Sequence, residues 1–292
     1  MMSDAQTHTQ KVARFHDGMM PKLLGGRTDR SYNNIGRWSG VTESIEQANT
    51  ALFTSVVELA GAGPGDIVLD VGCSYARSTA ELVTRWRCDR AVGIEVAAKV
   101  CEFARESLRR DGLDDVVDVR NMSATHLTFG EGEFTKVICV DAAFQFDSRE
   151  AFFRQAHRVL RAGGVLALAD VVAGRARLSR VEQRVARWCQ SYWYVPASNR
   201  YGLDGYVERL RECGFTGVRV ESIGADVFGG AADFIRVPAN ARAQRAEHGL
   251  VGSLVYGFML KTLAWMCRRG VIDYVLVRAE RPAAPPSQEP AS

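Results

Sequence analysis

The chain has 292 residues, a net charge of +3, and 47% hydrophobic and 24% charged residues. These are values of a globular protein that can bury a core, and they argue against a disordered chain. No basic run alternates with aromatic residues, so nucleic acid is not expected as a partner. The seven scattered cysteines form no C-x-x-C pair and the five histidines show no ligand spacing. We therefore expect reduced cysteines, no metal site and a cytoplasmic location.

The chain begins with a polar segment that contains scattered aromatic side chains. We assign residues 1–41 to an N-terminal segment or lid, and residues 42–172 to the cofactor-binding core. Residues 42–60 have apolar side chains at helical spacing and predict an amphipathic helix. The Gly-Ala-Gly-Pro-Gly run at 61–65 ends that helix.

From residue 67 the pattern alternates between strands and helices. Strands are predicted at 67–71, 91–94, 116–120, 136–140 and 165–172, and helices at 78–86, 97–110 and 148–161. The first strand is too continuously apolar to be half exposed, so we place it in the centre of a parallel sheet. Such alternation predicts an α/β fold whose parallel sheet is covered by helices on both faces.

The alternation is interrupted after residue 172. Residues 173–280 form the remainder of the core, with strands at 216–223 and 272–279 and a helix at 204–213, and residues 281–292 are predicted to be a disordered tail. Helical insertions at 173–203 and 225–270 are expected to sit above the sheet as lids. In the first, Trp188, Tyr192, Trp193 and Tyr194 fit an acceptor pocket or a lid core equally well.

The second insertion contains a long apolar run, Leu250–Cys267. Lys261, Ser253, Thr262 and two glycines argue against a membrane-spanning helix, so a lid helix is favoured. A helix that lies on a membrane surface to reach a lipid is the lesser alternative.

A turn that suits a nucleotide cofactor follows the first strand. The stretch from Val68 to Thr79 runs from a strand through Gly72 into a helix, which brings backbone N–H groups up to a ligand. Glu95 ends the next strand, 23 residues after Gly72, and could bind ribose hydroxyls. These features alone also fit a nicotinamide site.

Four stretches in order resemble the class I S-adenosylmethionine-dependent methyltransferases. Asp70 and Gly72 match an acidic, glycine-rich motif, and Val92–Glu95 and Val140–Phe146 match the next two motifs. The stretch from His157 to Asp170, with its Gly-Gly turn, is the most specific match. The resemblance implies a Rossmann-like, doubly wound, seven-stranded sheet with an antiparallel last strand and helical lid insertions. It also implies S-adenosyl-L-methionine as cofactor.

The resemblance also implies roles for individual residues. Asp70 would hold the methionine amino group, Gly72 would allow close backbone approach, and Glu95 would bind the ribose. Ser123 and Ala124 would flank the adenine, and Tyr32 would close over the sulfonium. Ser74 and Ala76 occupy positions where the family has its second and third glycines, at a cost of about 1 kcal/mol for each left-handed residue.

Two residues after the fourth strand are the catalytic candidates. Gln145 stands where the family often has histidine, and an amide cannot accept a proton near neutral pH, so Gln145 would orient the acceptor. A hydroxyl acceptor would then need another base, either Asp141 or a lid residue. His157 is expected to be a packing residue and His126 to be exposed.

The function predicted is methyl transfer to oxygen or carbon of a small, largely apolar acceptor such as a polyketide, terpenoid or lipid-like molecule. The main alternative is an enzyme of the same fold that has lost methyl transfer and catalyses cyclisation, rearrangement or elimination. A nicotinamide-dependent oxidoreductase and a non-catalytic binding subunit are the other two. The partners expected are a small apolar molecule and, as one option, a second copy in a homodimer, with no stable membrane insertion.

Overall fold

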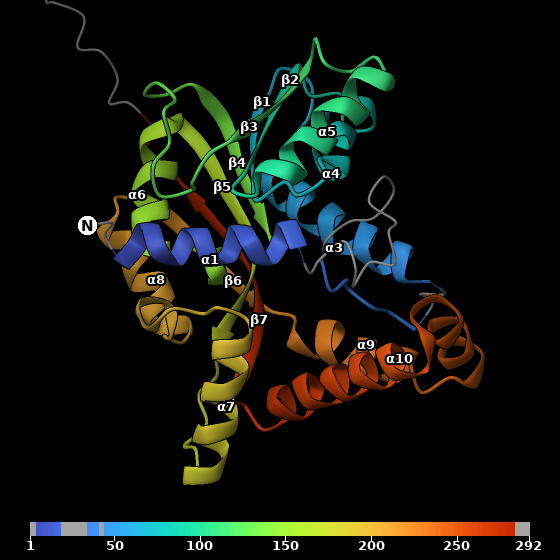
Figure 1. Ribbon diagram of the computed structural model, residues 1–292. Coiled ribbons are helices and arrows are strands. Elements are labelled where there is room, and N and C mark those ends of the chain that lie inside the picture. The colour runs from blue at the N-terminus through green and yellow to red at the C-terminus, as the bar shows by residue number, and fades with distance from the viewer. Residues whose placement is uncertain (1–3, 19–33, 41–43, 284–292) are drawn as a thin grey trace, which may run out of the picture.

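The computed structural model describes residues 4–18, 34–40 and 44–283. Seven strands form one sheet in the order β3-β2-β1-β4-β5-β7-β6 (Figure 1). The strands are β1 (Ile67–Val71), β2 (Arg90–Glu95), β3 (Val117–Asn121), β4 (Phe134–Val140), β5 (Leu160–Ala173), β6 (Thr216–Ser222) and β7 (Ile272–Glu280). The chain order reverses on either side of β1, so the doubly wound α/β fold predicted from the sequence is confirmed.

The far end of the sheet contains its only antiparallel pairings among the described residues. Strands β1 to β5 pair in parallel, whereas β7 runs antiparallel to both β5 and β6. The expected antiparallel last strand and the pairing of the strands predicted at 216–223 and 272–279 are therefore confirmed.

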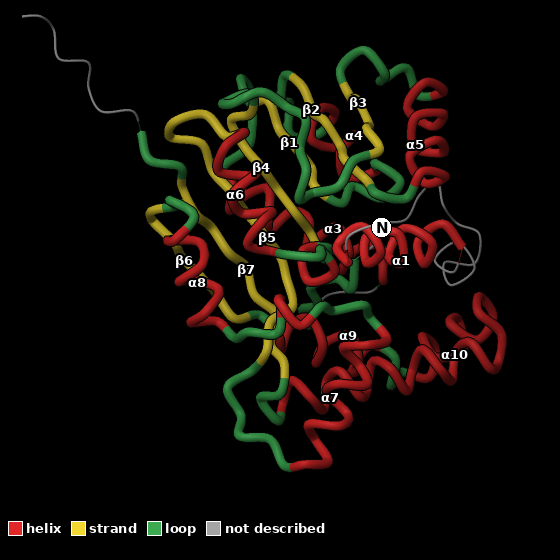
Figure 2. The backbone as a smooth tube through the Cα atoms, turned by 60° about the vertical axis from the view of Figure 1, so that its left-hand side comes forward, coloured by secondary structure: helices red, strands yellow, loops and turns green. Residues whose placement is uncertain are grey.

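Helices cover both faces of the sheet (Figure 2). One face packs against α3 (Ile45–Ala60), α4 (Arg77–Thr84) and α5 (Ala98–Arg110), and the other against α6 (Arg149–Val159) and α8 (Leu203–Glu212). Successive strand residues point to opposite faces, so Val68 packs in one core and Leu69 in the other. This double burial explains why β1 is continuously apolar.

Local signals set several helix ends. Ser44 accepts a hydrogen bond from the Gln47 N–H at the start of α3, and Gly61, with a φ of 63°, ends that helix. The Ser148 hydroxyl caps α6 in the same way. By contrast, Ala76 precedes α4 without a side-chain cap, which leaves the start of that helix facing the turn after β1.

The remaining helices lie outside the two layers. They are α1 (Asp4–Gly18), α7 (Arg180–Tyr192), α9 (Gly230–Phe234), α10 (Pro238–Arg268) and three short turns, η1 (Ala143–Gln145), η2 (Ala197–Asn199) and η3 (Ala225–Gly229). Helix α10 is interrupted at Gly249, which has a φ of 71°. In Figure 1, α7 and α10 project from the same end of the molecule, and α1 crosses near the carboxyl ends of the central strands.

Two elements differ from their predicted bounds. The Gly-Gly turn was expected to precede the fifth strand at 165, but β5 begins at Leu160, which already pairs with Phe134. Gly163, with a φ of 76°, lies inside this irregular part of the strand. Within the helical insertion predicted at 173–203, the α-helix is only Arg180–Tyr192, and Ser179 and Glu182 form a capping box that sets its start.

Candidate functional site

The turn after β1 places three alternate residues in the left-handed region. Gly72, Ser74 and Ala76 have φ values of 81°, 50° and 58°. A Cβ on Gly72 would lie 2.6 Å from the Ala142 Cβ, so only glycine fits where β1 and β4 end side by side. Ser74 and Ala76, which replace two glycines of the family's motif, therefore both have the left-handed backbone that favours glycine.

The side chains of Ser74 and Ala76 have different surroundings. Ala76 is 1% exposed and packs into the core beneath α4, and it is absent from the pocket lining. Ser74 lines the pocket, and its backbone N–H donates to Glu95 Oε2 over 3.3 Å. The methyl group of Ala76 thus leaves the space beside Gly72 open.

Asp70 lies behind the turn rather than in the pocket. Its Oδ2 accepts hydrogen bonds from the Thr79 hydroxyl at 2.7 Å and the Ser78 hydroxyl at 3.0 Å. Burial raises the pKa of Asp70 to about 6, and the two hydroxyls act in the opposite direction. In the described structure Asp70 connects β1 to the first turn of α4.

Glu95 lies at the end of β2 and lines the pocket. Its Oε1 accepts from the backbone N–H groups of Val96 and Ala97, at 2.7 and 2.9 Å. Its Oε2 accepts from Ser74. Each carboxylate oxygen has two lone pairs, so Glu95 can hold the turn and still accept from one ribose hydroxyl through Oε2.

The loop after β3 forms the opposite wall. Met122, Ser123 and Ala124 all line the pocket together with Ile94. The Ser123 hydroxyl lies 3.0 Å from the Thr125 hydroxyl. Met122 did not emerge from the sequence, although its position directly before Ser123 in the same loop could have suggested it.

Asp141 follows β4 and faces the same pocket. It has a φ of 56°, and its Oδ2 accepts from the Ile35 N–H at 3.1 Å. Burial raises the pKa of Asp141 to about 7, with the Ile35 hydrogen bond opposing this and the negative charge of Asp170 adding to it. A carboxyl group with this pKa can exchange a proton near neutral pH.

Gln145 joins three segments around the pocket. Its Oε1 lies 3.0 Å from His16 Nε2, and its backbone carbonyl lies 2.9 Å from His8 Nε2. Its Nε2 donates to the Trp193 carbonyl over 3.1 Å. Both polar atoms of the amide therefore have protein partners, which attach α1 and the segment after α7 to the turn that follows β4.

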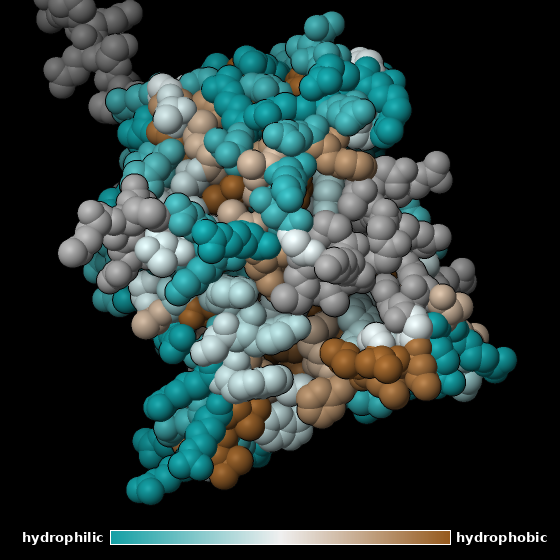
Figure 3. Space-filling view, in the orientation of Figure 1, coloured by the Kyte–Doolittle hydropathy of each residue, from teal (hydrophilic) through white to brown (hydrophobic). Residues whose placement is uncertain are grey.

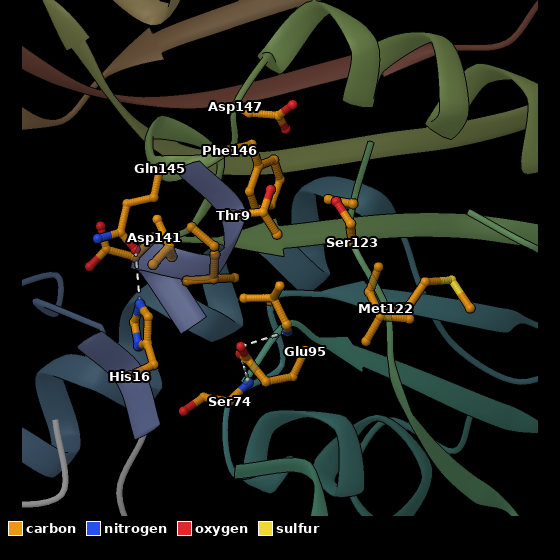
Figure 4. Close-up of a pocket in the computed structure, with 17 residues that line it drawn as sticks. Thr9, His16, Ser74, Glu95, Met122, Ser123, Asp141, Gln145, Phe146 and Asp147 are labelled. Carbon is orange, nitrogen blue, oxygen red and sulfur yellow. Dashed lines mark hydrogen bonds between the residues drawn. The ribbon is translucent and has the colours of Figure 1, made fainter. Parts of the chain in front are cut away.

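Figure 4 shows how these side chains converge on one cavity. Helix α1 forms its outer wall through Thr9, Val12 and His16. These three residues were not singled out in the sequence. The apolar pair Val12 and Phe15, buried on one face of α1, is the one signal that could have indicated a packed helix there.

The aromatic residues that the sequence suggested for the cofactor and acceptor sites differ in outcome. Tyr32 lies outside the described residues. Trp188 and Tyr192 line neither the cavity at the carboxyl ends of the strands nor the hollow beside α10, and their exposed fractions of 62% and 42% place them outside a lid core. Tyr194 contacts Phe15 of α1, with ring centroids 5.4 Å apart.

The two histidines that were given no catalytic role from the sequence, His157 and His126, have the predicted surroundings. His157 packs edge-on against Phe215, with ring centroids 5.1 Å apart, and His126 is exposed. The two helical insertions contribute no residue to the lining of this cavity; in the described chain they border a separate hollow instead.

The residues of this cavity suit S-adenosylmethionine. An acidic side chain ends β2, and apolar groups from Ile94, Met122 and Ala124 form a slot of the kind that holds a purine. Beside Gly72 the backbone itself forms the wall, so a ligand can approach it closely. The cofactor expected from the sequence thus fits the chemistry of the site.

Comparison with known proteins agrees with this geometry. Residues 69–168 match the family model described as a methyltransferase domain. Erythromycin 3''-O-methyltransferase of Saccharopolyspora erythraea is 27% identical over 267 residues, which cover 88% of this chain and 86% of that protein.

Two solved structures share the fold. The 4+2 cyclase SpnF has a TM-score of 0.71 and 20% identity, and the match covers 94% of this chain and 97% of the cyclase. Geranyl diphosphate C-methyltransferase of Streptomyces coelicolor A3(2), solved with S-adenosyl-L-homocysteine, has a TM-score of 0.74 and 16% identity, with coverage of 96% and 100%. These likenesses concern the fold.

The sheet order, the glycine turn and the acidic residue at the end of β2 define a nucleotide-binding methyltransferase fold. Residues 69–168 belong to the methyltransferase domain family, and the residues of the site fit S-adenosyl-L-methionine as the cofactor.

Proposed function

We propose that the enzyme methylates a hydroxyl oxygen of a small, largely apolar natural product in the cytoplasm, with Asp141 as the general base. The observation that carries the proposal is the carboxyl group of Asp141, which lines the cavity and has a pKa of about 7. The choice of oxygen is supported by the erythromycin relative, whose name specifies an O-methyltransferase.

The cofactor supplies a methyl group on a positively charged sulfur, which leaves as a neutral thioether when the acceptor oxygen displaces it. We propose that Glu95 accepts a hydrogen bond from a ribose hydroxyl, that Gly72 and Ser74 provide the backbone wall, and that Ser123 and Ala124 flank the adenine. Asp70 holds the turn through the hydroxyls of α4, so its part in binding the methionine amino group is indirect.

The acceptor hydroxyl loses its proton as the new bond between oxygen and carbon forms. Asp141 takes that proton, since an ionised carboxylate with a raised pKa is a competent base near pH 7. Gln145 cannot accept a proton. We propose that it orients the acceptor by fixing the ring of His16 beside the cavity. Positioning then supplies much of the remaining rate.

The test uses the full chain, S-adenosylmethionine and acceptors of the erythromycin type that differ in one free or already methylated hydroxyl. We expect a methylated product and S-adenosylhomocysteine in equal amounts, only from the free hydroxyl. The Asp141→Asn variant should lower kcat by roughly 10²–10⁴-fold, with donor affinity nearly unchanged. The wild-type kcat should rise with pH through about 7, and the variant should lose this dependence.

Two results would contradict the proposal. Asp141→Asn with wild-type kcat would exclude Asp141 as the base while leaving methyl transfer intact. An isomerised acceptor formed without any S-adenosylhomocysteine would favour the alternative function, cyclisation or rearrangement, over methyl transfer.

A further inference from the structure

Helices α7 and α10 expose large apolar side chains that the site does not use. In the described chain these include Val251, Phe258 and Trp188, with exposed fractions of 74%, 67% and 62%. Others are Val181, Tyr192, Leu250, Leu254, Val255 and Trp265. Single exposed apolar residues are normal, but many of them gathered along two helices mark an interaction surface.

The exposed residues of α10 form one stripe along the helix. Leu254, Phe258, Lys261, Trp265 and Arg268 are all exposed and follow one another at intervals of three or four residues, which places them on one face. The segment Gly249–Arg268 contains no acidic residue. Its stripe therefore combines apolar and basic side chains only.

Helix α7 adds a second stripe of the same kind. Arg184, Arg187 and Trp188 are exposed on it, and Trp188 stacks on Tyr192 with centroids 6.0 Å apart. The ion pair between Arg269 and Glu182, 2.8 Å long, joins the end of α10 to the start of α7. Figure 3 shows apolar surface over both helices on one face of the molecule.

The positive charge of the protein is concentrated in these insertions. Residues 173–203 contain six arginines and one glutamate, and residues 225–270 contain five arginines, one lysine and three acidic residues. The whole chain has a net charge of only +3, so the rest of the molecule is net negative. The apolar surface is therefore also the basic one.

We propose that the exposed faces of α7 and of Gly249–Arg268 bind peripherally to a membrane surface rich in anionic phospholipid. Apolar side chains enter the boundary between headgroups and acyl chains, and the basic side chains meet the lipid phosphates. The long stems of Lys261 and Arg268 allow their charges to reach the headgroups while neighbouring apolar groups are buried.

Two other arrangements of this surface fit the observations less well. A twofold contact between copies through this surface would bring lysine and arginine against themselves without facing carboxylates. A membrane-spanning helix is opposed by the charge of Lys261 in the middle of the segment. By length and composition Gly249–Arg268 is apolar enough to cross a membrane, and 22% of its apolar window is buried in the protein.

A hollow of about 1120 Å³ opens beside this surface. It is lined by Ala264 and Arg268 of α10, by Gly174 and Arg175 before α7, and by Trp38 and Phe234 on its apolar side, among other residues. An apolar molecule carried in the bilayer would meet this hollow on the side that faces the lipid.

The experiment is vesicle flotation of the full chain, with vesicles of phosphatidylcholine alone or mixed with phosphatidylglycerol. We expect flotation with the mixed vesicles, release by high salt, and at least tenfold weaker binding to phosphatidylcholine alone. The Leu254→Ser/Phe258→Ser variant should lose at least tenfold in affinity, because both side chains are exposed and their removal spares the core. The Arg184→Gln/Lys261→Gln variant should lose affinity for the mixed vesicles.

A matched control removes the same amount of charge from another part of the surface. Arg109 and Arg110 are exposed on α5, far from α7 and α10 in Figure 1, so Arg109→Gln/Arg110→Gln should bind vesicles as the wild type does. Sedimentation equilibrium without lipid measures self-association of the same variants. The proposal is overturned if the chain does not float with mixed vesicles. Self-association or binding to an acidic protein would then be the use of this surface. The proposal is also overturned if the bound chain resists extraction by alkaline carbonate, which would indicate insertion.

Discussion

The ring of His16 and the side-chain amide of Gln145 meet across 129 residues of sequence, with 3.0 Å between His16 Nε2 and Gln145 Oε1. Because the Gln145 Nε2 donates to the Trp193 carbonyl, its Oε1 must be the acceptor toward His16. The His16 Nε2 therefore carries a hydrogen. This bond fastens α1 over the cofactor cavity.

The first prediction concerns this attachment. The His16→Ala variant removes the hydrogen bond, so α1 should detach more often from the turn after β4. We expect amide exchange in residues 4–18 to accelerate several-fold and the Kd for S-adenosylhomocysteine to rise, with a loss of about 1 kcal/mol in the local opening free energy. Exchange mass spectrometry and calorimetry measure both effects. Arg14→Ala, an exposed position on the same helix, should change neither quantity.

The second prediction concerns Asp141 and pH. Its pKa is raised from 3.8 to about 7 in the folded state, so the folded chain binds this proton more tightly than the unfolded chain does. The contribution of Asp141 to stability is thus most favourable below pH 3.8 and is lost as pH rises toward 7. The Asp141→Asn variant should be more stable than the wild type at pH 8, by at most about 4 kcal/mol, and this difference should shrink as the pH falls from 7 to 5.

Urea unfolding at a series of pH values measures this difference. A gain that stays constant from pH 5 to pH 8 would show that Asp141 does not titrate in that range. The result is independent of whether Asp141 acts as the base, because it requires no acceptor.

The third prediction uses two glycines with similar backbone conformations. Gly72 and Gly112 have φ values of 81° and 68°, but a Cβ on Gly72 would lie 2.6 Å from Ala142 whereas one on Gly112 would have open space. Gly112→Ala should cost about 1 kcal/mol from backbone strain alone. Gly72→Ala should cost about 2–4 kcal/mol, since steric overlap adds to the strain, and should also weaken donor binding. Equal losses in the two variants would disagree with a tight junction between β1 and β4.

The fourth prediction concerns a buried ion pair beneath the site. Arg149 Nε lies 2.8 Å from Asp170 Oδ2, with side-chain exposures of 1% and 0%, and the Tyr206 hydroxyl donates to the same oxygen. Arg149→Met should destabilise the fold by about 3–5 kcal/mol, because it leaves Asp170 buried without its counter-charge.

The control lies one turn further along α6. Arg154 is exposed and pairs with Glu150, so Arg154→Met should cost less than about 0.5 kcal/mol. Adding Asp170→Leu to Arg149→Met should recover part of the loss in urea unfolding. No recovery would mean that packing, and not the unpaired charge, causes the loss.

The sequence by itself determined the sheet and the cofactor loop. Ile67–Val71 forms β1 as predicted, and Gly72, Ser74 and Glu95 meet at one cavity. These features could be predicted because apolar runs, turn residues and helix caps determine local structure over only a few residues. Parallel strands then bring their carboxyl ends to the same edge of the sheet. That rule places Asp141 and Gln145 beside Gly72, which the alternation of elements already implied.

The tertiary structure alone decided what covers the cavity and what remains exposed. No local pattern links α1 to Gln145, and the two lid insertions border a different hollow. The pKa of Asp141 depends on burial beside Ile35 and Asp170, which are distant in the sequence. Apolar residues at helical spacing predict a helix face but not its neighbour, since the same stripe can be buried in a core or left on the surface. The exposed stripes of α7 and α10 were therefore visible only once the chain was folded.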